Sequence, residues 1–152
     1  MTQFFQFEAD FIESLRCIPM LVRFKLDTCG VKLALSHWNK FPQQVRQTLV
    51  DRSCTTPTEI RAYREELQQL VLQYSDTPAK ELPVEENPPW MDATAVPVQV
   101  SEKAREFDAA IGSDQWASLT PLQRFALIKL SRSSHENSNF LPACQEFNLI
   151  GN

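Results

Sequence analysis

Few residues of this chain have side chains suited to acid–base chemistry, and their spacing does not point to a catalytic set. His37 and His135 are the two histidines, and neither has a serine, cysteine or carboxylate partner at a motif spacing. The triplet His135, Glu136 and Asn137 places a base, an acid and an amide side by side, but successive side chains point in different directions unless a turn gathers them. We therefore interpret this triplet as a hydrogen-bonding cluster that orders its loop or contacts a partner, and we expect no catalytic residue in the chain.

The four cysteines lie far apart in the sequence, at positions 17, 29, 54 and 144, and include no C-x-x-C pair. Zinc and iron–sulfur sites need closely spaced ligands, so we expect buried thiols and no metal site. The sequence also lacks a phosphate-binding loop, a dinucleotide-binding glycine turn and an H-E-x-x-H helix. We therefore expect no cofactor.

Composition favours a helical protein that remains in the cytoplasm. The 152 residues include 43% hydrophobic and 22% charged residues but only three glycines, which leaves few positions for tight hairpins. We find no apolar run of roughly 18 residues and no secretory leader, so we expect neither membrane insertion nor export. The net charge is −4 and no dense Lys/Arg stripe occurs, which argues against a nucleic-acid partner.

The segment 76–100 reads as a linker. It holds five of the ten prolines and carries one basic and five acidic groups, so its net charge equals that of the whole chain. Proline removes backbone donors and restricts the preceding residue, which favours an extended, semi-rigid segment. The predicted fold is all-α, with a helical lobe at 1–75, this acidic linker at 76–100 and a second helical lobe at 101–152, packing together as one compact unit.

The clearest predicted helix runs from Pro57 to Tyr74, because Thr56 and Glu59 form a capping box around a proline at the first helical position. The segment from Met20 to Leu35 leaves two alternatives open. Alternating apolar and polar residues fit a β-hairpin. A helix that starts after Pro19 and stops at Gly30 in the left-handed region also fits, and we favour it.

A short pattern occurs twice, with every member displaced by 78 residues: Trp38, Phe41, Arg46 and Leu49 recur as Trp116, Leu119, Arg124 and Leu127. This indicates two related lobes, although so short a pattern can also arise by chance. Ser36 and Asp114 are the expected N-caps before the tryptophans, and Pro42 and Pro121 are expected to open the following helices.

In the C-terminal lobe we expect a helix capped by Ser101 that ends at Ile111 before Gly112. A second helix, from Pro121 to about Leu130, is apolar on nearly every side and should therefore be central to its lobe. A last short helix should begin near Phe140.

Four further residues are candidates for partner binding. Trp90 and Met91 lie in the acidic, proline-rich segment, where a large ring must dock on this chain or on a partner to be shielded from water. Phe4 and Phe5 lie close to the N-terminus, where exposed aromatic rings would form a sticky patch. For both pairs, packing on the chain's own core is the alternative interpretation.

The order of residues resembles the nitrate reductase-associated proteins of cyanobacteria and some other bacteria. The resemblance covers Phe4 to Asp10, Ile18 to Leu35, Trp38, Pro121 to Arg132 and His135 to Phe147, and the linker is the part least covered. It rests above all on these residues: Pro19, Met20, Arg23, Lys25, Leu26, Asp27, Gly30, Lys32, Leu33, Gln123, Arg124, Phe125, Lys129 and Leu130. It implies a role in nitrate assimilation, in a genomic setting with molybdenum-cofactor genes, and brings no established catalytic residues.

Three hypotheses follow. The first is a non-catalytic accessory that binds the catalytic subunit of the molybdenum-containing assimilatory nitrate reductase, as a lasting subunit or as a maturation factor. The alternative is a small enzyme or carrier that binds a metal or the molybdenum cofactor through the loop around His135 and Cys144. The third is a docking aid for ferredoxin, which the acidic linker opposes because ferredoxins are themselves acidic.

Overall fold

The computed structural model describes residues 4–9, 15–132 and 139–150 and has the predicted all-α fold: eight α-helices and one two-stranded sheet in the described residues. The chain divides into unit 1, Met1–Val84, and unit 2, Glu85–Asn152. None of the helices in the described part of the chain is long and apolar enough to cross a membrane.

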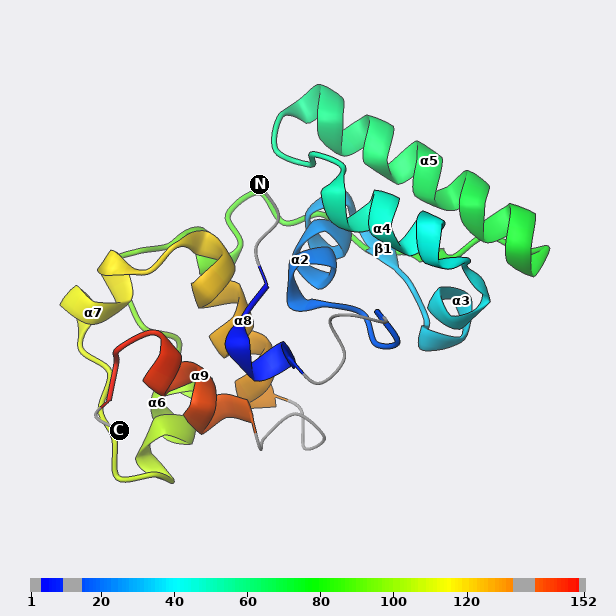
Figure 1. Cartoon of the computed structure of the whole chain (residues 1–152). Coiled ribbons are helices and arrows are strands. Elements are labelled where there is room, and N and C mark those ends of the chain that lie inside the picture. The colour runs from blue at the N-terminus through cyan, green and yellow to red at the C-terminus, as the bar shows by residue number, and fades with distance from the viewer. Residues whose placement is uncertain (1–3, 10–14, 133–138, 151–152) are drawn as a thin grey trace. The chain divides into compact units, whose positions relative to one another are not determined.

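Unit 1 contains a short 3-10 turn, four α-helices and both strands (Figure 1). In chain order they are η1 (Gln6–Glu8), α2 (Met20–Cys29), β1 (Val31–Lys32), α3 (Leu35–Lys40), α4 (Gln43–Asp51), α5 (Pro57–Ser75) and β2 (Lys80–Glu81).

Helix α2 resolves the ambiguity of the Met20–Leu35 segment in favour of the helix. It starts after Pro19, and Gly30 terminates it with φ +78°, in the left-handed region where glycine carries no Cβ penalty. A Cβ on Gly30 would also lie 2.7 Å from both the Leu82 backbone oxygen and a Val84 methyl carbon. Gly30 is therefore required both by its own backbone conformation and by the chain that returns beside it.

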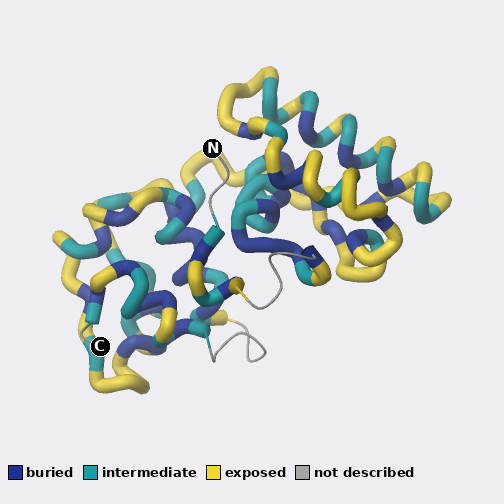
Figure 2. Tube along the Cα trace, in the orientation of Figure 1, coloured by how far each residue is buried: buried dark blue, intermediate teal, exposed yellow. Residues whose placement is uncertain are grey.

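Helix α5 begins as the sequence predicts. The Glu59 N–H donates to the Thr56 hydroxyl at 3.2 Å, and the Glu59 carboxylate accepts from the backbone N–H groups of Thr55 and Thr56 at 3.1 and 3.0 Å. Buried and exposed residues alternate along this helix with the helical period (Figure 2).

Strands β1 and β2 pair antiparallel although about 50 residues separate them in the chain. Helix α5 holds β2 through side chains: the Gln68 amide both donates to and accepts from the Ala79 backbone at 2.9 Å, and Arg64 forms an ion pair with Glu81. The start of the segment predicted as a linker thus lies on unit 1.

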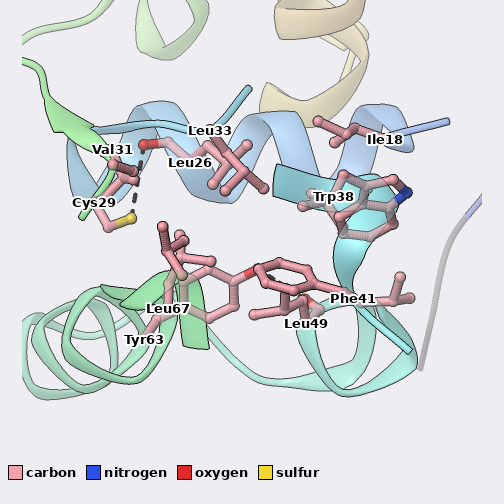
Figure 3. Packing of buried hydrophobic residues seen from close by; sticks show 14 of the residues in the cluster. Ile18, Leu26, Cys29, Val31, Leu33, Trp38, Phe41, Leu49, Tyr63 and Leu67 are labelled. Carbon is pink, nitrogen blue, oxygen red and sulfur yellow. Dashed lines mark hydrogen bonds between the residues drawn. The ribbon is translucent and has the colours of Figure 1, made fainter. Parts of the chain in front are cut away.

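The core of unit 1 lies between α2, α3, α4 and α5 (Figure 3). Tyr63 and Leu67 enter it from α5, opposite Leu26 of α2, and the Tyr63 hydroxyl donates to the Leu49 carbonyl at 2.8 Å. All four of these side chains are 5% exposed or less. The hydroxyl partner matters because a buried phenol without one would destabilise the fold.

Unit 2 is built around α8 (Pro121–Arg132), which contacts η2 (Pro89–Met91), α6 (Val98–Arg105) and α9 (Phe140–Glu146). Seven of its twelve residues are buried, as expected for a helix that is apolar on nearly every side. The remaining helix, α7 (Ser113–Ser118), precedes α8 in the chain.

Several predicted caps are wrong. Helix α6 begins after Pro97 rather than at Ser101 and ends at Arg105, well before Ile111. Gly112, predicted as a helix stop, is the N-cap of α7 with φ −77°, and Asp114 lies inside that helix. The corresponding helix α3 starts after Ala34 rather than at Ser36. In α3 and α7 the side chain at the third helical position accepts from the N–H of the N-cap residue: the His37 Nδ1 from the Ala34 N–H at 3.2 Å and the Gln115 Oε1 from the Gly112 N–H at 2.8 Å.

The two units repeat one three-helix motif, which extends the short sequence echo to whole helices. Helices α2 and α3 start at Met20 and Leu35, and α6 and α7 start 78 residues later, at Val98 and Ser113. Helices α4 and α8, which start at Gln43 and Pro121, keep the same displacement. The N-caps Pro19 and Pro97 also correspond.

Candidate partner-binding surface

Trp90 lies in unit 2 as the centre of the 3-10 turn η2, and only 8% of it is exposed. Its ring meets the ring of Phe125 edge-on, with 5.1 Å between centroids and 86° between planes. Pro88 as N-cap and Pro89 at the first position favour this short turn, because their fixed φ suits a helical start. The unit's own residues thus shield the tryptophan that the sequence singles out.

Two side chains from α7 and α8 fix the backbone on either side of Met91. The Arg124 Nε donates to the Trp90 carbonyl at 2.7 Å, and the Trp116 Nε1 donates to the Asp92 carbonyl at 2.9 Å. Arg124 also donates from Nη1 to the carbonyls of Trp116 and Leu119, at 3.3 and 2.8 Å. We call this arrangement the Trp–Arg clamp of unit 2.

Arg124 is a buried cation, with 5% of its surface exposed. Burial lowers its pKa because it disfavours the charged form, and the nearby carboxylate of Asp92 acts in the opposite direction. Carbonyl dipoles therefore take the place of water around the guanidinium, which suits its planar fork of donors.

Met91 and Asp92 are both exposed. Met91 is 57% exposed although its neighbour Trp90 is buried. The Asp92 carboxylate accepts from the Thr94 N–H at 2.9 Å, and its bonds to Thr94 lower its pKa, which keeps Asp92 charged at neutral pH. An apolar and a charged side chain thus stand together on a fixed turn.

Unit 1 contains the counterpart of this clamp. The Trp38 Nε1 and the Arg46 Nη1 both donate to the Leu15 carbonyl, at 2.6 and 3.2 Å, and the Arg46 Nε donates to the Trp38 carbonyl at 3.2 Å. This role was not predicted from the sequence, although the shared Trp-to-Arg spacing of eight residues is a signal that could have revealed it.

The N-terminal aromatic residues are packed to different extents. Phe4 is half-buried, whereas Phe5 is 3% exposed and stacks on Phe7 with 5.2 Å between ring centroids. The buried carboxylate of Glu8 accepts from the Phe5 N–H at 3.3 Å and from the Met20 N–H, at the start of α2, at 2.7 Å. A negative group at a helix N-terminus is stabilising, and here it ties the N-terminal segment to α2.

His135, Glu136 and Asn137 lie outside the described residues, so their arrangement stays a prediction. Cys144, which sequence reasoning places beside that loop as a possible ligand, is 1% exposed, and burial raises its pKa to about 12. Burial likewise raises the pKa values of Cys29 and Cys54 to about 12 and about 11. Such thiols stay protonated at neutral pH, whereas a metal ligand or nucleophile requires the thiolate. Among the described residues no group of three His, Cys, Asp or Glu side chains is placed to hold a metal ion.

A polar depression of about 540 Å³ runs along α5 and is lined by Arg61, Arg64, Glu65, Gln68, Gln69 and Glu81. Arg64, Gln68 and Glu81 are the same side chains that attach β2 to α5. We therefore interpret this depression as part of the attachment of the strand.

Comparison with known proteins supplies the family. No curated protein and no solved structure is significantly similar to the chain. The model of one family, described as conserved nitrate reductase-associated protein, matches residues 4–147, nearly the whole chain, and confirms the resemblance seen in the sequence. The chain therefore belongs to the family of conserved nitrate reductase-associated proteins.

Proposed function

We propose that this protein is a non-catalytic accessory of nitrate assimilation that works in the cytoplasm and binds the catalytic subunit of the molybdenum-containing assimilatory nitrate reductase. The observation that carries the proposal is the family match over residues 4–147, since association with nitrate reductase is what the family is named for. The bound enzyme gains activity from this association, either because the accessory is a lasting subunit or because it holds the apo-enzyme ready for cofactor insertion.

The chemistry of the described residues supports an accessory role. In the described part of the chain, His37 accepts a backbone hydrogen bond at the start of α3, and Cys29, Cys54 and Cys144 are buried thiols. The buried polar side chains Glu8 and Arg124 bind backbone groups of their own unit. These interactions stabilise the fold of the unit to which they belong.

Co-expression with the reductase followed by size-exclusion chromatography tests the proposal. We expect the two chains to elute together, and the reductase prepared with and without its molybdenum cofactor distinguishes the two modes of association. A lasting subunit elutes with both forms, whereas a maturation factor elutes with the cofactor-free form and is released when the cofactor is loaded. Separate elution from both forms would refute the proposal.

A further inference from the structure

We propose that the exposed part of the segment 85–92, which carries Met91 and the acidic residues Glu85, Glu86 and Asp92 and is here called the Met91 face, docks on the reductase. Its partner surface would be an apolar pocket rimmed by lysine and arginine. This inference rests on the proposed function and deepens it, because it names the contact surface and the chemistry of the partner.

The backbone that presents Met91 is fixed on both sides. The carbonyl of Trp90 accepts from Arg124 at 2.7 Å and the carbonyl of Asp92 accepts from Trp116 at 2.9 Å, while the Trp90 ring is held against Phe125. A side chain displayed on a backbone that is already ordered loses less conformational entropy on binding, which increases affinity. The turn is therefore suited to present one exposed side chain.

In both units the clamp holds the backbone of a buried residue: Leu15 in unit 1 is 1% exposed and Trp90 in unit 2 is 8% exposed. Met91 lies between the two carbonyls that the clamp of unit 2 holds and is 57% exposed. Burial of Trp90 thus leaves Met91 as the exposed side chain of η2.

Charge specifies the rim of the partner pocket. The sequence of unit 2 carries five basic and nine acidic residues, which gives −4, whereas the sequence of unit 1 carries ten of each. Glu85, Glu86 and Asp92 are all exposed. Opposite charges across an interface steer association and exclude wrong partners, so these carboxylates fit a basic rim and disfavour an acidic partner such as ferredoxin.

Methionine is suited to the centre of such a contact because its unbranched thioether adapts to an apolar pocket. Full burial of its side chain accounts for about 10- to 100-fold in the dissociation constant. The neighbouring carboxylates contribute mainly to the association rate and to its dependence on salt.

The test measures the dissociation constant of the purified full-length protein for purified assimilatory nitrate reductase by biolayer interferometry at low and high salt. We expect Met91→Ala to weaken binding at least about tenfold without lowering the melting temperature, because Met91 is exposed. The double variant Glu85→Lys with Glu86→Lys should slow association and reduce its salt dependence. The matched control is Val98→Ser. Val98 is an apolar side chain of the same unit, 69% exposed and outside the Met91 face, so its removal should leave the dissociation constant unchanged.

The outcomes separate this inference from the proposed function on which it rests. If the wild-type protein binds and both Met91→Ala and the double lysine variant have dissociation constants within twofold of the wild-type value, the Met91 face is refuted. The accessory function is retained in that case. Failure of the wild-type protein to bind any form of the reductase refutes both. Trp90→Ala tests the clamp separately: we expect it to lower the melting temperature, and an unchanged melting temperature would contradict the packing of Trp90 against Phe125.

Discussion

Removal of the Arg124 guanidinium is the perturbation whose effect the structure predicts most sharply, because the chain holds a matched control in Arg46. Arg124 is buried and donates to the carbonyls of Trp90, Trp116 and Leu119 at 2.7, 3.3 and 2.8 Å. Arg46 occupies the equivalent place in unit 1, but it is partly exposed, and its bonds to the carbonyls of Leu15, Trp38 and Asn39 are each 3.2 Å long. The same substitution at the two sites should therefore have different effects on the free energy of unfolding.

The magnitude follows from the acceptors that lose their donor. In Arg124→Ala the carbonyls of Trp90 and Leu119 lose the guanidinium, whereas the Trp116 carbonyl keeps the Leu119 N–H as donor at 3.1 Å. Each unsatisfied buried acceptor costs about 1–3 kcal/mol, so we expect the two to cost about 2–6 kcal/mol together. In Arg46→Ala the Leu15 carbonyl keeps the Trp38 Nε1 as donor at 2.6 Å and the Trp38 carbonyl keeps the Phe41 N–H at 3.1 Å, while Asn39 is exposed. We therefore expect a loss of about 1–2 kcal/mol.

Urea unfolding followed by far-ultraviolet circular dichroism measures both losses, and hydrogen exchange locates them. Exchange should accelerate around Trp90 and Asp92 in Arg124→Ala and around Leu15 in Arg46→Ala. Arg124→Lys keeps the charge but not the planar fork, so its loss should be intermediate. A loss for Arg46→Ala equal to or larger than that for Arg124→Ala would refute the reasoning.

Three other predictions concern the turn after α2, the cap of α5 and the thiols. Gly30→Ala should lower the free energy of unfolding by about 2–3 kcal/mol, because φ is +78° and the added Cβ would lie 2.7 Å from two atoms. In the control Gly112→Ala φ is −77°, and urea titration should show a loss of less than about 1 kcal/mol. Bonds from two backbone N–H groups lower the Glu59 pKa below its ordinary 4.5, so its stabilisation is complete above that value and disappears as the pH falls through the lower folded-state pKa. Glu59→Gln should therefore flatten this part of the acid-unfolding curve, and a curve with unchanged slope would contradict the cap. Half-buried Cys17 should react with a thiol reagent in the folded protein and buried Cys144 only after unfolding, which mass spectrometry of the labelled peptides can establish.

Local signals in the sequence predicted the helices whose ends depend on neighbouring residues. Pro19 and Gly30 bound α2, and the Thr56–Glu59 capping box starts α5, because both devices act within one or two helical turns. The wrong caps at Ser101 and Asp114 have a local cause as well. Pro97 has the extended backbone of an N-cap, so α6 begins before Ser101. Gly112 is the N-cap of α7, and its N–H donates to the Gln115 side chain, so α7 begins without the Asp114 carboxylate as its cap.

Features that depend on contacts between distant residues could not be predicted from the sequence. A tryptophan in a proline-rich segment has the same local pattern whether it docks at home or on a partner, and Trp90 is buried only because α8 supplies Phe125 and Arg124. The pairing of β1 with β2 joins residues about 50 positions apart in the chain and involves two residues on each strand, too few for an alternating pattern.

The candidate surface was therefore predicted only in part. Sequence reasoning singled out both Trp90 and Met91, but the neighbours have opposite exposure, and only the folded unit distinguishes the anchor from the displayed side chain. The repeat of Trp and Arg was visible in the sequence, yet its function as a clamp requires the positions of the carbonyls that accept from it.

Association with assimilatory nitrate reductase can be measured by capture of the tagged protein from nitrate-grown cells of its native host, followed by quantitative mass spectrometry. We expect the catalytic subunit of the reductase to be enriched strongly over a tag-only control and Met91→Ala to reduce the enrichment. Enrichment of the reductase no greater than in the tag-only control, from extracts that contain the enzyme in both its cofactor-free and its loaded form, would contradict the proposed association.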